Sequence, residues 1–147
     1  MADTVTTQIV LETPDQIKVH WTGISDGTGE TNVRKIVLAN LLAAPIGTAA
    51  PVVPVALDLE SIRWGITGHG YVKLSWDHAV DSTMMVLMNS GFEDFTGRDG
   101  EFKQAPRSSG LKDPKTADST GDVFLSIVTP VNLGAYDITA TFAKRAA

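Results

Sequence analysis

The sequence of 147 residues has no cysteine, and this absence excludes disulfides, thiolate zinc sites, iron–sulfur clusters and thiol catalysis. It also has no long apolar run, since nothing in it approaches the roughly 18 consecutive apolar residues of a membrane-spanning helix. Its first residues, Met1–Thr6, lack the basic and apolar regions of a secretory signal. We therefore expect the cell that synthesises the chain to keep it in its cytoplasm, and we expect no membrane partner.

Basic residues are in the minority: 12 Lys and Arg stand against 17 Asp and Glu, which gives a net charge of −5. A surface of this sign does not attract nucleic acid non-specifically, so no nucleic-acid partner is predicted. A chain of this length can bury roughly two-thirds of its unfolded surface without a disulfide or a structural metal. We predict a single domain that spans 1–147.

Apolar and polar residues alternate along much of the chain, as they do in strands with one buried face. The alternation is clearest over 17–21, 62–66, 72–76 and 136–142. Further strands are predicted over 5–11, in the first half of 32–44, and over 57–62, 84–88 and 123–128. A helix is the alternative for 32–44. The continuously apolar segment 84–88 predicts a strand that is covered on both faces.

Local signals add detail to these strands. The apolar phase changes between Leu59 and Ile62, which predicts a bulge or a tight bend near Glu60. The glycine-rich segment 68–70 lies between two alternating runs and predicts a hairpin turn. On 5–11, alternate residues from Val5 to Leu11 are expected to share one face. The three tryptophans all fall on the apolar phase and are expected in the core: Trp21, Trp64 and Trp76.

These patterns predict an all-β protein of eight or nine strands without a helix. Because several strands have an apolar face, we predict two antiparallel sheets packed as a β-sandwich, with a jelly roll as one arrangement that fits. Two long excursions interrupt the strands. The first excursion, 41–56, is rich in Ala and Pro, which forbids regular strand pairing. The second excursion, 96–121, has almost no apolar residue, and loops of this length are usually functional or disordered.

No group of residues in the sequence indicates catalysis or metal binding. The spacing of the three histidines, His20, His69 and His78, matches no metal pair, and we expect all three to be solvated. Spacing alone leaves a Ser-His-Asp arrangement open, but no Gly-x-Ser-x-Gly motif is present. We predict that the protein is not an enzyme and has no cofactor, no catalytic residue and no metal ligand.

The two excursions are the predicted partner-binding segments. The second excursion holds five basic and four acidic residues, a mixed charge that suits a protein partner and an ordering on docking, although a surface loop without a partner is the alternative. The first excursion carries exposed apolar residues, which predict self-association, with a trimer favoured. The candidate contact residues are Leu41, Leu42, Ile46, Val52 and Val53 in the first excursion, and Arg98, Phe102, Lys103, Arg107 and Lys112 in the second.

Several short segments, taken in order, resemble small β proteins encoded among the virion structural genes of tailed bacteriophages. They are Lys18–Trp21, Asp26–Glu30, Ile62–Gly68, Val72–Asp77, Gly91–Phe95, Ser119–Val123, Tyr136–Thr139 and the closing Lys144-Arg145. The resemblance implies a virion component, most simply a capsid decoration or cement protein that binds and stabilises the coat lattice. Its partners would be the major capsid protein or other virion proteins.

Other functions remain open at this point. A neck or tail component belongs to the same class of structural proteins. A carbohydrate-binding module for host adsorption is a different class, and it would need exposed aromatic side chains. The resemblance implies no catalytic residue.

Overall fold

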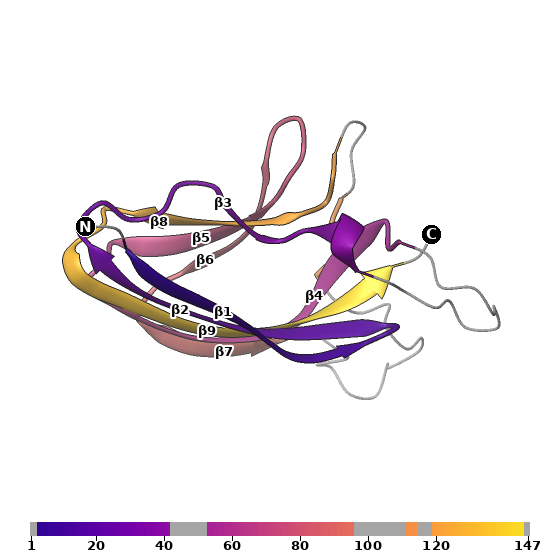
Figure 1. Cartoon of the computed structure of the whole chain (residues 1–147), viewed down its shortest axis with the longest axis horizontal. Coiled ribbons are helices and arrows are strands. Elements are labelled where there is room, and N and C mark those ends of the chain that lie inside the picture. Colours follow the sequence, from indigo (N-terminus) through magenta and orange to yellow (C-terminus); the bar gives the residue numbers. More distant parts are fainter. Residues whose placement is uncertain (1–2, 42–52, 96–110, 115–118, 146–147) are drawn as a thin grey trace.

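The computed structural model describes residues 3–41, 53–95, 111–114 and 119–145 (Figure 1). Within them the chain forms nine strands and one short 3-10 helix, η1. Their bounds are β1 (Thr4–Thr13), β2 (Gln16–Asp26), β3 (Val33–Ile36), η1 (Leu38–Asn40), β4 (Ala56–Thr67), β5 (Tyr71–Trp76), β6 (Ser82–Leu87), β7 (Ser90–Asp94), β8 (Val123–Val128) and β9 (Asn132–Arg145). No helix among the described residues has the length and apolar character to cross a membrane.

The strands form two antiparallel sheets that lie face to face (Figure 1). One sheet has the order β1-β2-β9-β4-β7 and the other the order β3-β8-β5-β6. From β2 onward the pairs are nested, because β2 pairs with β9, β3 with β8, β4 with β7 and β5 with β6. A long hairpin folded over on itself in this way is a jelly roll, and β1 is a ninth strand added beside β2. The predicted sandwich is confirmed.

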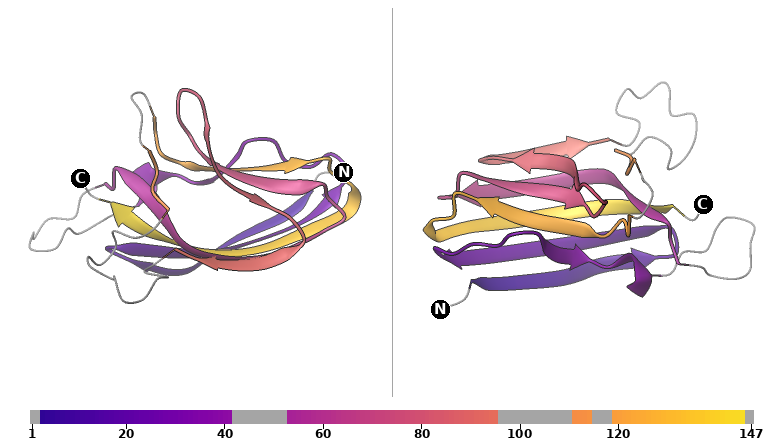
Figure 2. Two further views of the ribbon diagram at one scale, coloured as in Figure 1. Left: turned by 180° about the vertical axis from the view of Figure 1, so that it is seen from behind. Right: turned by 90° about the horizontal axis from the view of Figure 1, so that it is seen from above.

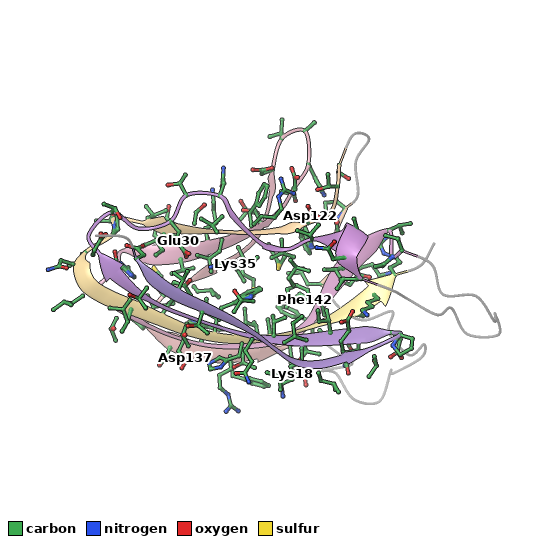
Figure 3. The ribbon with its side chains drawn as sticks, in the orientation of Figure 1. Lys18, Glu30, Lys35, Asp122, Asp137 and Phe142 are labelled. Carbon is green, nitrogen blue, oxygen red and sulfur yellow. The ribbon has the colours of Figure 1, made fainter. Side chains whose placement is uncertain are left out.

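The core lies between the two sheets and is made by the apolar phase of the predicted strands. Trp21 and Phe142 are completely buried there, with ring centroids 6.4 Å apart, and Figure 3 shows Phe142 pointing between the sheets. Trp76 is also buried, and its indole N–H donates to the carbonyl of Leu57 at 2.9 Å. Trp64 packs against the same core but is only half-buried, because it lies beside the edge strand β7. The prediction of a core position is therefore confirmed for two tryptophans and holds in part for the third.

The bulge predicted near Glu60 is confirmed, because the β4–β9 register shifts between Leu59 and Ser61. The hairpin predicted at 68–70 is wrong: β4 and β5 belong to different sheets, so this turn crosses the sandwich. Gly68 permits the crossing through its φ of +81° and its close approach to the backbone of Gly134. The double coverage predicted for 84–88 is also wrong, because β6 is an edge strand with exposed residues on its outer face.

Strand β1 differs from every other strand in its burial. Nine of its ten residues are exposed, and the tenth is half-buried. Figure 2 shows it at the edge of the five-stranded sheet. The expectation of one shared face over 5–11 is wrong at its end, because a bulge after Ile9 places Leu11 opposite Lys18 instead of an inward residue. Val5, Thr7 and Ile9 keep a common face, opposite Gly23, Trp21 and Val19 respectively.

Candidate functional site at one end of the sandwich

The strand order decides where the two excursions leave the sandwich. Successive strands from β2 to β9 reverse direction, so the β3–β4, β5–β6 and β7–β8 connections all leave and rejoin the sandwich at one end, which we call the loop end. The first excursion is the β3–β4 connection, and the second is the β7–β8 connection. Figure 1 shows η1 and the C-terminal end of β9 at this same end. The two excursions lie far apart in the sequence, but both of them begin and end at the loop end.

The start of the first excursion is fastened to the end of the second by Asp122. Its Oδ1 accepts a hydrogen bond from the backbone N–H of Leu38 in η1 at 2.8 Å, and its Oδ2 accepts one from Arg34. Arg34 also reaches Asp77 in the β5–β6 connection, with 3.0 Å between Nη1 and Oδ2. All three connections of the loop end meet in this cluster.

Two neighbouring acids stabilise the positive charge of Arg34. Partial burial lowers the pKa of its guanidinium, but the hydrogen bonds and negative charges of Asp122 and Asp77 outweigh it and raise that pKa above its usual value. The guanidinium also lies 4.6 Å from the centroid of the Phe124 ring. Arg34 is therefore a permanent positive charge between two acids.

The second excursion returns to the sheet earlier than expected. Leu111 forms an isolated bridge to Leu59 of β4, and each residue donates its N–H to the other's carbonyl at 2.8 Å. The sequence predicts one long loop over 96–121, and no strand lies there among the described residues, but residues 111–113 are joined to β4 by hydrogen bonds. Lys112, between the two anchoring residues, is exposed.

A second buried cluster lies beside this bridge. His78 Nε2 is 2.6 Å from Asp113 Oδ1, and their side chains are only 2% and 0% exposed. Asp58 Oδ1 accepts from the backbone N–H of Asp113 at 3.1 Å and from Arg145 Nη2 at 3.0 Å. Arg145 Nη2 also donates to the carbonyl of Asp113 at 2.7 Å. Asp113 of the second excursion is therefore bound by residues from three places: the end of β9, the start of β4 and the β5–β6 connection.

The expectation that all three histidines are solvated is wrong for His78 and holds in part for His20 and His69. His78 is buried, which corrects that expectation. His69 is half-buried, and burial lowers the pKa of its imidazole. His20 lies on the outer face of the five-stranded sheet, 2.8 Å from Asp137 Oδ1, and Figure 3 shows Asp137 on the side away from the second sheet. Among the described residues, no three His, Asp or Glu side chains gather as a metal site.

Three of the ten predicted contact residues are described. Leu41 is buried in the core, Val53 is 49% exposed, and Lys112 is exposed. Leu41 thus anchors the first excursion, which corrects its expected role at a surface. The other seven lie outside the described residues: Leu42, Ile46, Val52, Arg98, Phe102, Lys103 and Arg107.

Sequence reasoning missed the residues that build the base of the loop end. They are Arg34, Asp58, His78, Asp113, Asp122 and Arg145. One signal was available for Asp58, because it lies between two apolar residues in a strand whose phase is about to shift. Nothing in the sequence pairs Asp113 with His78, since 35 positions separate them.

The outer face of the five-stranded sheet is a second candidate surface. A shallow hollow on it is lined by Lys18, Ser61, Arg63, Phe92, Thr139 and Thr141. The Arg63 guanidinium lies 5.6 Å from the centroid of the exposed Phe92 ring. Two of the three tryptophans are buried, so they cannot stack on a sugar at this face.

No family model, no curated protein and no solved structure matches the chain.

Proposed function

We propose that this protein is a structural component of a phage virion, a capsid decoration or cement protein that binds the outside of the coat lattice through its loop end. The proposal follows the sequence resemblance described above. The observation that supports it best is that both long excursions leave and rejoin the sandwich at one end, on a base of buried and partly buried polar side chains joined by hydrogen bonds. The described ends of both excursions lie at the end of the sandwich that would face the partner surface.

Contact alone accounts for the stabilisation. A protein that binds only the intact lattice shifts the dissociation of that lattice by mass action, and no chemical step is needed. Two segments that leave one rigid base can reach neighbouring coat subunits together, so the second contact is made at a high effective concentration. The virion is then the location of the protein, after synthesis in the host cytoplasm.

The test uses particles assembled without this protein, to which the full chain is added back. We expect saturable binding at many copies per particle, in a fixed ratio to the coat protein, and rupture of the particles at a higher temperature. Quantitative proteomics of complete virions gives the copy number independently. A handful of copies per virion would refute the decoration role and favour a neck or tail component.

A matched pair of variants tests the loop end itself. Val53→Asp places a charge at the base of the first excursion, and we expect it to weaken binding to the particles. Leu133→Asp makes the same kind of change at the opposite end of the sandwich, where Leu133 is 76% exposed, and should leave binding unchanged. Equal effects of the two variants would contradict docking through the loop end. Binding of the chain to glycans, with no binding to the particles, would instead support a carbohydrate-binding module.

A further inference from the structure

The edge of the five-stranded sheet formed by β1 lacks the features that normally protect an edge strand. Exposed edges are usually guarded by charge, proline, short length or a covering segment. Thr4–Leu11 contains eight residues with no charge and no proline, and no described part of the chain covers it. Its large apolar side chains are about half exposed: Val5, Ile9, Val10 and Leu11.

The other three edges of the described structure are better protected. Strand β3 has four residues, two of them basic, and β7 carries Glu93 and Asp94. Strand β6 is uncharged, but it is shorter than β1 and buries Met84 and Leu87 in the core. The segment Thr4–Leu11 of β1 is therefore the one long, uncharged edge among the described strands, and its outer side pairs with no described strand.

We propose that β1 pairs antiparallel with β1 of a second copy of this chain, so that two five-stranded sheets join into one continuous sheet across a two-fold axis. This inference does not depend on the virion role. The partner strand is β1 of a second copy because Thr4–Leu11 is complementary to itself in an antiparallel pair. Val5, Thr7 and Ile9 share the inner face and are evenly spaced about Thr7.

The register follows from the geometry of a continuous sheet. Residues directly opposite each other must point to the same face of the sheet. A two-fold axis normal to the sheet must therefore pass midway between one residue and the same residue of the partner strand. When this axis lies between the two copies of Thr7, Val5 is opposite the partner's Ile9 and Thr7 is opposite the partner's Thr7. Cross-strand pairs of β-branched residues and of threonines are favourable. The bulge after Ile9 ends this regular segment.

Charge supports self-pairing over the head-to-tail alternative. In the Thr7 register, Asp3 and Glu12, the acids flanking this neutral run, do not face each other. Pairing of β1 with β7 of another copy would instead set the acidic Glu93 and Asp94 beside a strand that has no basic residue. A head-to-tail contact would also build rings such as trimers, or filaments, whereas the two-fold contact closes at a dimer.

The test is the mass of the full-length protein in solution, measured by sedimentation over a range of micromolar concentrations. We expect a reversible dimer. Thr7→Lys should raise its dissociation constant on the order of tenfold or more, because the residue on the axis meets its own copy and two lysines then lie opposite each other. Thr7→Glu should do the same. An equimolar mixture of the two variants should restore the dimer, because lysine then faces glutamate.

A matched control is Val86→Lys on the uncharged edge β6, where Val86 is 49% exposed, as β1 residues are. It should leave the dimer unchanged, and thermal melts should show that all variants fold. A monomer at high micromolar concentration would overturn the proposal. So would a trimer, or a dimer that Thr7→Lys leaves intact. An oligomer lost in both single variants and not restored by mixing them would overturn the Thr7 register.

Discussion

Truncation of Asp113 tests whether the base of the loop end holds the second excursion in place. In the structure, His78 Nε2 lies 2.6 Å from the Asp113 carboxylate, and both side chains are almost fully buried. Asp113→Ala removes this contact and leaves a buried imidazole nitrogen without its partner. Removing one partner of a buried hydrogen bond costs about 1–3 kcal/mol, because the group left behind has lost both its partner and its water.

We therefore expect Asp113→Ala to lower the free energy of unfolding by up to about 3 kcal/mol. For a domain of this size that corresponds to a fall in Tm of roughly 10 °C. The effect should be strongest near the bridge between Leu111 and Leu59, so amide exchange of Leu111 should accelerate more than exchange in the central strands. Chemical denaturation and hydrogen exchange measure the two quantities separately.

The neighbouring residue provides the control for this prediction. Lys112 is exposed, and Lys112→Ala should change stability by less than about 0.5 kcal/mol. A loss below about 1 kcal/mol in Asp113→Ala, with no change in Leu111 exchange, would refute the view that this cluster anchors the second excursion.

Three further predictions concern the buried polar cluster near the other end of the core, where Lys35 Nζ lies 2.9 Å from Glu30 Oε1 and Tyr136 donates to Glu30 Oε2 at 2.8 Å. Lys35→Met should lower the free energy of unfolding by about 3–5 kcal/mol, because it leaves the buried Glu30 carboxylate without its cation. Adding Glu30→Gln should recover much of this loss in a double-mutant cycle, and additive losses would contradict the coupling. Burial is the larger cause, and the hydrogen bond to Glu30 the smaller cause, that raises the pKa of Tyr136. The stability from this tyrosine should therefore be intact below about pH 10, the unfolded pKa, and should fall above it by at most about 1.4 kcal/mol per pH unit. A flat profile in alkaline denaturation would contradict this prediction. Gly23→Ala should cost about 1–3 kcal/mol because its Cβ would lie 2.4 Å from the Tyr136 ring, whereas Gly65→Ala, with nothing within 4 Å, should be close to neutral in the same melts.

The local rules of the sequence predicted much of the fold, because strand patterning depends on neighbours along the chain. Alternation located β2, β4, β5 and β9, and the phase change at Glu60 located the bulge that keeps both halves of β4 facing the core. The same rules failed at 68–70, since a glycine turn between two alternating runs suits a hairpin and a crossing between sheets equally well. Which of the two forms is decided by the partners that β4 and β5 find elsewhere.

The candidate site was less predictable than the strands. The sequence located the first excursion through its prolines and the second through its lack of apolar residues, but it treated the second as one loop. Its anchor is made by long-range contacts, Leu111 to Leu59 and Asp113 to His78, and no local pattern encodes them. The burial of His78 was missed for the same reason, because an imidazole after a strand is solvated unless a distant chain segment covers it.

By itself, the sequence determined that this protein is a two-sheet β structure, with a core of alternating apolar residues and two long interruptions, because side-chain period and proline content act locally. Only the tertiary structure decided that the strands nest as a jelly roll, that both interruptions leave and rejoin the sandwich at one end, and that no described segment covers β1 at its sheet edge. The physical reason is that strand pairing joins residues far apart in the chain: β2 pairs with β9 across more than a hundred positions. The strand pattern permits many such pairings, and the packing of all the apolar faces together selects one.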